Sequence, residues 1–154
     1  MTNDHLISTL NDLIQISKDG EKGFLTCAED AEERYANYKE MFRARATECA
    51  QTVLDLQDLV HRLGGEPANH STFGGTLHRQ WVNLKSAVTG RDDEAILNEC
   101  ERGEDAAVHA YRKALSQDLP NDVRLIVERQ YQGVLANHDK VRGLRNQVRA
   151  RKAA

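Results

Sequence analysis

The sequence predicts an all-α fold, a bundle of four long helices with one shorter helix between the second and the third. Apolar residues recur at steps of three and four along four long segments, which is the spacing of a buried helix face. Two prolines and 5% aromatic residues favour helix over sheet. The chain has 154 residues, enough for one domain with a core, so we expect a single domain over residues 1–154.

The first two long helices are delimited by their inward stripes and by one strong stop signal. The first helix is predicted to begin near Asn3 or Asp4, either of which can cap it. Its inward positions are Leu6, Leu10, Leu13, Ser17, Glu21, Phe24, Ala28 and Ala31. After a weak break near residues 33–37, the second helix carries inward Tyr38, Phe42, Arg45, Cys49, Thr52, Leu56, Leu59 and Leu63. It is expected to end at Leu63-Gly64-Gly65-Glu66-Pro67, because glycine followed by proline stops a helix.

The second half of the chain holds the shorter helix and two more long ones. The short helix is expected over residues 76–89, with Trp81 as the structural anchor that holds it on the bundle. The third long helix runs from about Glu94 to Gln117, and its inward stripe is Leu97, Glu101, Glu104, Val108, Tyr111 and Leu115. After a corner at Leu119-Pro120, the fourth helix continues to about Arg149 with Val123, Val127, Gln130, Val134, Asn137, Val141, Leu144 and Val148 at core spacing.

The C-terminal end, about residues 140–154, is basic. It contains Lys140, Arg142, Arg145, Arg149, Arg151 and Lys152. We favour the interpretation that these charges complement the negative end of a long helix and stay solvated. The alternative is contact with an anionic partner.

The connection between the second and third long helices is long enough to run the length of the bundle, which is the ferritin-like arrangement. Counting residues from the two hairpin turns places Glu21 level with Glu48, and Glu101 level with His138, to within one or two ångströms at about 1.5 Å per residue. These residues and Glu104 are therefore predicted to converge near the middle of the bundle. A carboxylate there is costly unless it is paired, protonated or bound to metal.

Carboxylates and an imidazole inside a helical bundle are the ligands of iron and manganese sites. The complete two-metal pattern has one glutamate on each of two helices and Glu-x-x-His on each of the other two. This sequence has Gln51 and Leu135 where a histidine and a glutamate would stand, which favours one ion over two. Arg45, Gln51 and Gln130 are expected beside the ligands. The alternative is a metal-free network of Glu21, Arg45, Glu101 or Glu104, Gln130 and His138 that fixes helix register.

Several classes of function find no support in the sequence. The 21 basic and 24 acidic residues are nearly balanced, so nucleic-acid binding is not expected. No segment has the apolar length of a membrane span or the pattern of a secretory signal. Cys27, Cys49 and Cys100 lack metal-ligand spacing and are expected to be reduced thiols in a cytoplasmic protein. A long helix hairpin can pair with a second copy, so a homo-oligomer is compatible with the sequence.

Four segments carry a resemblance to a known family: Asp19-Gly20-Glu21-Lys22-Gly23-Phe24, Leu63-Gly64-Gly65-Glu66-Pro67, Leu77-His78-Arg79-Gln80-Trp81 and Glu101-Arg102-Gly103-Glu104-Asp105. From about residue 5 to 146 the chain resembles an uncharacterised proteobacterial family of ferritin-like four-helix-bundle proteins, domain of unknown function 2383. The resemblance implies the ferritin-like bundle and a bacterial cytoplasmic origin.

That resemblance implies little chemistry, because the family has no assigned reaction. Its ferritin and rubrerythrin relatives bind iron and handle oxygen or peroxide, which suggests a stress-related role. Carried over by position, the ligand roles fall to Glu21, Glu48, Glu101 or Glu104, and His138. The departures at Gln51 and Leu135 argue against oxidase or peroxidase chemistry, so an enzyme is not the favoured interpretation. The alternative is a non-enzymatic interaction or structural module.

Overall fold

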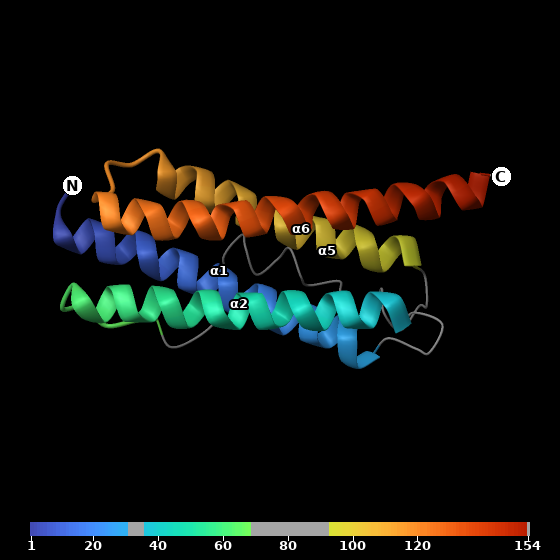
Figure 1. Cartoon of the computed structure of the whole chain (residues 1–154), viewed down its shortest axis with the longest axis horizontal. Helices are drawn as coiled ribbons and strands as arrows, with labels where there is room; N and C mark the ends of the chain where they lie inside the picture. Colours follow the sequence, from blue (N-terminus) through green and yellow to red (C-terminus); the bar gives the residue numbers. More distant parts are fainter. Residues whose placement is uncertain (31–35, 69–92, 154) are drawn as a thin grey trace.

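The computed structural model describes residues 1–30, 36–68 and 93–153, and within these ranges the chain is helical and contains no strand (Figure 1). The helices are α1 (Asn3–Asp30), α2 (Ala36–Arg62), α5 (Asp93–Leu115) and α6 (Asn121–Ala153). The predicted all-α fold with four long helices is therefore confirmed. The predicted short helix at 76–89 and its anchor Trp81 lie outside the described residues.

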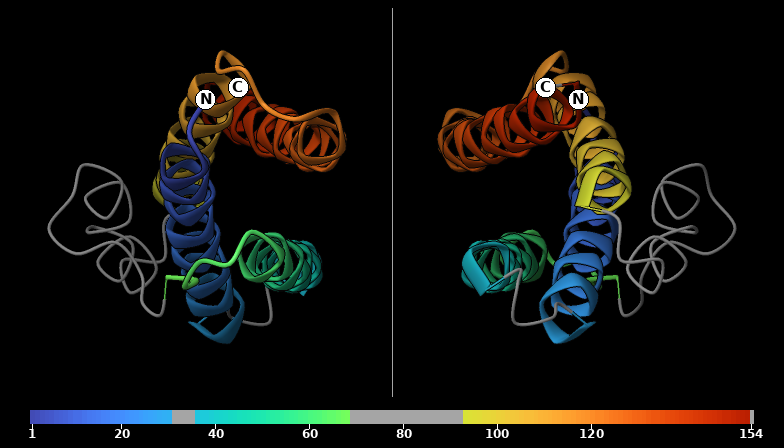
Figure 2. Two further views of the ribbon diagram at one scale, coloured as in Figure 1. Left: turned by 90° about the vertical axis from the view of Figure 1, so that its left-hand side faces the viewer. Right: turned by 90° about the vertical axis from the view of Figure 1, so that its right-hand side faces the viewer.

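The four helices form two antiparallel hairpins, α1 with α2 and α5 with α6 (Figure 1). Helix α2 ends at one end of the bundle and α5 begins at the other, so the connection between them joins opposite ends (Figure 1). Seen along the bundle, α1 and α5 form one wall, α2 lies beside α1, and α6 lies beside α5 (Figure 2). Helix α2 packs mainly against α1, and it contacts α6 only sparsely.

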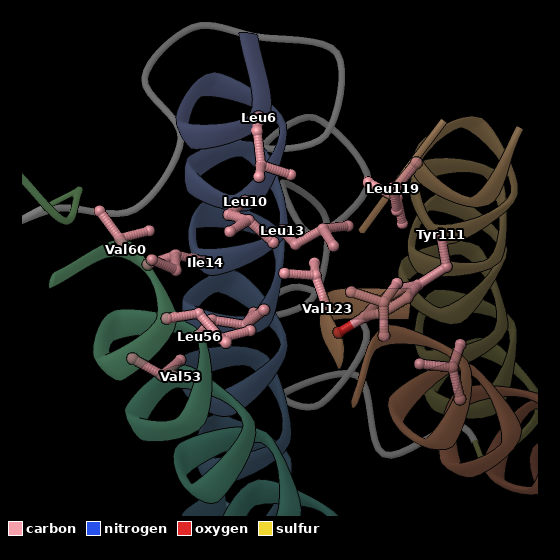
Figure 3. Packing of buried hydrophobic residues seen from close by; sticks show 14 of the residues in the cluster. Leu6, Leu10, Leu13, Ile14, Val53, Leu56, Val60, Tyr111, Leu119 and Val123 are labelled. Atoms are coloured by element: carbon pink, nitrogen blue, oxygen red, sulfur yellow. The ribbon is translucent and has the colours of Figure 1, made fainter. Parts of the chain in front are cut away.

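Among the described residues, the apolar interior consists of two clusters with polar residues between them. One cluster gathers side chains from all four helices and from the corner between α5 and α6, among them Leu10, Leu13, Leu56, Val60, Tyr111, Leu119 and Val123 (Figure 3). The other contains Phe24, Cys27, Phe42, Cys49, Leu97, Cys100, Val141 and Val148. Along α1, α5 and α6, the buried polar residues Ser17, Glu104 and Asn137 fall in the interval between these clusters. The bundle therefore contains a polar layer across its middle.

The end of α2 is a Schellman motif, as expected from its two glycines. The amide of Gly64 donates to the carbonyl of His61 at 3.0 Å, and the amide of Gly65 donates to the carbonyl of Val60 at 3.0 Å. Gly64 has a φ of 80°, which glycine adopts without a Cβ clash. The predicted helix stop at this position is confirmed.

The segment after α2 is attached to α1 by side-chain hydrogen bonds. Asn11 accepts a bond from the amide of Ala68 at 2.8 Å and donates to the carbonyl of Glu66 at 3.1 Å. Asn3 donates to the carbonyl of Leu63 at 3.0 Å. These bonds satisfy backbone groups of the segment that follows α2. They also fix the start of the long connection against α1.

The last turns of α6 are attached differently from the rest of the helix. Val148 is its last buried residue. Beyond it, Arg149 donates to Glu94 of α5 at 2.9 Å and Lys152 lies 3.4 Å from the same carboxylate. None of the described helices is long and apolar enough to span a membrane.

Candidate functional site

A buried ion pair connects α2 and α5 within the polar layer. Arg45 donates from Nε to Oε1 of Glu104 at 2.9 Å and from Nη2 to Oε2 at 3.4 Å. The two side chains are 7% and 2% exposed. Asn137 of α6 donates a third hydrogen bond to Glu104, at 3.0 Å. The carboxylate of Glu104 is therefore held by donors from two other helices, and charge-assisted bonds of this kind are the strong ones.

Burial and pairing act in opposite directions on these two groups. Burial raises the pKa of the Glu104 carboxyl above its ordinary value, and Arg45 and Asn137 offset part of that rise. For Arg45, burial would lower the guanidinium pKa, but the charge of Glu104 raises it above the ordinary value. Arg45 therefore stays cationic and supplies, from within the chain, the positive charge that a buried carboxylate requires.

A small cavity of about 20 Å³ lies beside the Arg45–Glu104 pair, between Ser17, Thr52 and Tyr111. This volume is room for about one water molecule. The Tyr111 hydroxyl donates to Gln130 at 3.0 Å, and burial raises the Tyr111 pKa above its ordinary value. The cavity is polar enough to hold a water and too small to admit a substrate.

A second polar cluster lies between α5 and α6 and contains Glu101, Asp105 and His138. One potential ligand atom from each residue lies within 4.8 Å of the others. Glu101 and Asp105 are four residues apart on α5 and so share a helix face, while His138 approaches from α6, with its Nε2 2.5 Å from Oδ1 of Asp105. Glu101 and His138 are buried, whereas the Asp105 side chain is 56% exposed. The cluster is thus open to solvent on the Asp105 side.

Two arginines of α6 also reach this cluster. Arg142 Nε lies 3.5 Å from Oε1 of Glu101, and Arg145 is in ion-pair contact with Oε2. Within the described part of the chain, Nε of Arg145 is buried and makes no hydrogen bond. Arg142 Nη2 also lies 3.5 Å from Nε2 of His138. The charge of Glu101 is therefore compensated by two arginines of α6, and the Arg145 guanidinium keeps one buried N–H group unsatisfied, which is costly.

The donor set of this cluster fits an iron or manganese ion. Two carboxylates and one imidazole combine the oxygen ligands suited to manganese with the nitrogen ligand suited to iron. Ligand atoms about 2.1 Å from one ion lie at most about 4.2 Å apart, so a spacing within 4.8 Å needs only a small contraction.

The structure brings together two of the residues predicted to converge, Glu101 and His138. Glu104 instead faces Arg45. Glu48 is exposed and accepts a bond from the outer side of the Arg45 guanidinium at 3.0 Å. Glu21 is partly exposed on α1.

The other predicted polar residues lie outside the cluster. Gln51 is exposed and donates to Asp55 at 2.9 Å. Gln130 is bonded to Tyr111 near the small cavity. Neither side chain is part of the group formed by Glu101, Asp105 and His138.

Sequence reasoning missed Asp105, Arg142 and Arg145 as members of this cluster. Asp105 lies off the apolar stripe of α5, but its spacing of four from Glu101 was a usable signal. Arg142 and Arg145 follow His138 by four and seven residues, which is again one helix face. A search for polar residues at these spacings from each candidate ligand would have found all three.

The three cysteines lie in the second apolar cluster and are free thiols. Sγ of Cys27 lies 3.7 Å from Sγ of Cys100. Burial raises the pKa of Cys49 to about 12 and that of Cys100 well above its ordinary value. Protonated thiols are poor ligands and poor nucleophiles, so Cys49 and Cys100 act as small apolar side chains.

Comparison with known proteins gives a family and no assigned activity. No curated protein matches the chain. A family model described as a domain of unknown function (DUF2383) matches residues 5–117, which covers α1, α2 and α5. His138, Arg142 and Arg145 of α6 lie beyond the matched range. The resemblance that the sequence motifs indicated is confirmed: the chain belongs to the DUF2383 family.

Proposed function

We propose that this protein is a ferritin-like four-helix bundle that binds one transition-metal ion through Glu101, Asp105 and His138. The observation that supports the proposal is the approach of these three ligand groups to within 4.8 Å. The ferritin-like class is supported by two antiparallel hairpins whose connection joins opposite ends of the bundle (Figure 1), which is the topology with one long crossover.

Iron and manganese are the proposed ions, because both accept mixed carboxylate and imidazole ligands. One ion is proposed because Arg45 already compensates Glu104. A bound ion would supply a Lewis acid open to solvent beside Asp105. We infer a cytoplasmic location, since three free thiols suit a reducing compartment.

Metal titration of matched variants tests the proposal. Calorimetry with Mn²⁺, and with Fe²⁺ under anaerobic conditions, would compare the wild type with His138→Ala and Asp105→Ala. His109→Ala is the control, because His109 is an exposed histidine on α5 outside the cluster. We expect about one ion per chain for the wild type and His109→Ala, and loss of binding in the other two. No binding by the wild type, or full binding by His138→Ala, would overturn the proposal.

A second candidate is a non-enzymatic structural or interaction module in which buried polar groups fix helix register. It is supported by the Arg45, Glu104 and Asn137 contacts, which connect three helices within the polar layer. Replacing Arg45 and Glu104 together by Met and Leu would test it. Under this proposal the double variant stays folded but loses a unique packing, seen as loss of dispersion in its amide NMR spectrum. A fully dispersed spectrum would argue against a register role.

A further inference from the structure

We propose that Arg145 and Arg142 are resident counter-ions of the proposed metal site, which an incoming divalent ion must displace from Glu101. The inference rests on the proposed function, because it concerns the same three ligands. It adds a competition between the chain's own cations and the metal. The affinity for metal is then set by α6 arginines that are not themselves ligands.

The arginines and the metal require the same ligand atoms. Arg142 lies 3.5 Å from Oε1 of Glu101 and 3.5 Å from Nε2 of His138, so it borders two of the three ligands. Arg145 contacts the other oxygen of Glu101. Both carboxylate oxygens are therefore occupied by guanidinium groups, and a cation that enters the cluster meets two like charges.

The ion pairs of Arg142 and Arg145 with Glu101 can be replaced by a metal more easily than the Arg45–Glu104 pair. Arg45 and Glu104 share two hydrogen bonds, a third comes from Asn137, and both side chains are almost fully buried. The Arg145 contact leaves its own Nε without a hydrogen bond among the described residues. A guanidinium that moves toward water recovers such a bond.

Exposure makes this movement available to both arginines. The Arg142 side chain is 50% exposed and the Arg145 side chain 17% exposed, and both lie on long, flexible stems. The exchange also preserves the local charge, since two guanidinium charges leave the carboxylate and one divalent ion replaces them. The site therefore favours a divalent over a monovalent cation.

Mn²⁺ titration of arginine variants tests the competition. Arg149→Ala is the matched control, because Arg149 makes the same kind of ion pair from α6 to α5, with Glu94 at 2.9 Å, but touches none of the three ligands. We expect Arg145→Ala to raise the affinity about tenfold, the factor for one charge-assisted hydrogen bond. Arg142→Ala, with its more exposed side chain, should raise it less. Arg149→Ala should leave it unchanged.

The rise in melting temperature on addition of Mn²⁺ is a second measurement. An arginine that only stabilised the fold would leave this rise unchanged when it is replaced. Saturating Mn²⁺ should raise the melting temperature of Arg145→Ala by more than that of the wild type, because the variant gains a ligand for a bare carboxylate. Arg145→Gln, which keeps most of the side-chain length, serves if Arg145→Ala does not fold. Equal or weaker Mn²⁺ affinity in both Arg145 variants, with normal wild-type binding, would overturn this inference and leave the proposed function standing. Absence of binding in the wild type and in every variant would overturn both.

Discussion

Nε of Arg45 lies 2.9 Å from Oε1 of Glu104, in the layer where residue counting predicted a metal ligand. In this bundle a guanidinium from α2 occupies the position next to the α5 carboxylate that a cation would take. The same helix therefore presents two glutamates in different states. Glu104 is compensated by Arg45 of α2, and Glu101 is compensated by Arg142 and Arg145 of α6.

The free energy of unfolding should depend strongly on the Arg45–Glu104 pair. Arg45→Met leaves Glu104 buried without its counter-ion, and we expect a loss of about 3–5 kcal/mol in the free energy of unfolding at pH 7. Urea denaturation measures it. Arg62→Met is the control on the same helix, because Arg62 pairs with Asp58 at the surface, and its loss should stay below about 1 kcal/mol. Similar losses in both variants would contradict the role assigned to Arg45.

The same variant should show a pH dependence of defined sign. Burial raises the pKa of Glu104 above 4.5 in the folded protein, and loss of Arg45 raises it further. The native state then binds more protons than the unfolded state above pH 4.5, so stability falls as the pH rises through this window. The deficit of Arg45→Met relative to wild type should therefore shrink between pH 7 and pH 5.

A second substitution isolates the group responsible for that dependence. Adding Glu104→Gln to Arg45→Met removes the titrating carboxyl, so the deficit of this double variant relative to Glu104→Gln alone should be nearly independent of pH. Urea denaturation at a series of pH values gives the comparison. A deficit of Arg45→Met that is constant from pH 7 to pH 5 would show that Glu104 is not the group concerned.

Two glycine substitutions should change stability in opposite directions. Gly64 has a φ of 80°, so Gly64→Ala should cost about 1 kcal/mol through Cβ strain. Gly143 lies within α6 and a Cβ there meets nothing within 4 Å, so Gly143→Ala should stabilise by up to about 1 kcal/mol. Thermal or urea unfolding of both variants measures whether each is less or more stable than the wild type. A Gly64→Ala variant as stable as the wild type would contradict the Schellman motif at the end of α2.

The buried thiols should be unreactive in the folded protein. With the pKa of Cys49 raised to about 12 and that of Cys100 also raised, these two side chains form almost no thiolate at pH 8, and Cys27 is shielded by its burial. A thiol reagent such as Ellman's should label the native protein slowly and label all three cysteines at once in urea. Rapid native labelling of Cys49 or Cys100, located by peptide mass spectrometry, would contradict their burial.

Local signals were sufficient to predict the four described helices and the end of α2. The three- and four-residue steps gave the faces, and Gly64-Gly65 gave a stop that the structure shows as hydrogen bonds to His61 and Val60. These features depend on residues near one another in the chain. They could therefore be predicted without knowing how the helices pack.

The partners of the polar residues were harder to predict, because counting residues gives only the position along the bundle. It placed Glu101 and Glu104 near the middle of the bundle. It did not give the direction in which each side chain points. Glu104 meets Arg45 from α2, whereas Glu101 meets Arg145 from α6. Asp105 was not predicted as a member of the cluster, because it lies off the apolar stripe of α5 and its side chain is more than half exposed. Such pairings depend on helix rotation and side-chain reach, which periodicity does not encode.

The last turns of α6 are attached to α5 by Arg149 and Lys152, which share the carboxylate of Glu94. Exposed charges interact over a Debye length of about 10 Å at 0.1 M ionic strength and about 3 Å at 1 M. The end of α6 should therefore fray in concentrated salt, with faster amide hydrogen exchange beyond Val148, while the core-packed turns exchange as before. The bundle carries at its C-terminus a segment whose order depends on the electrolyte around it.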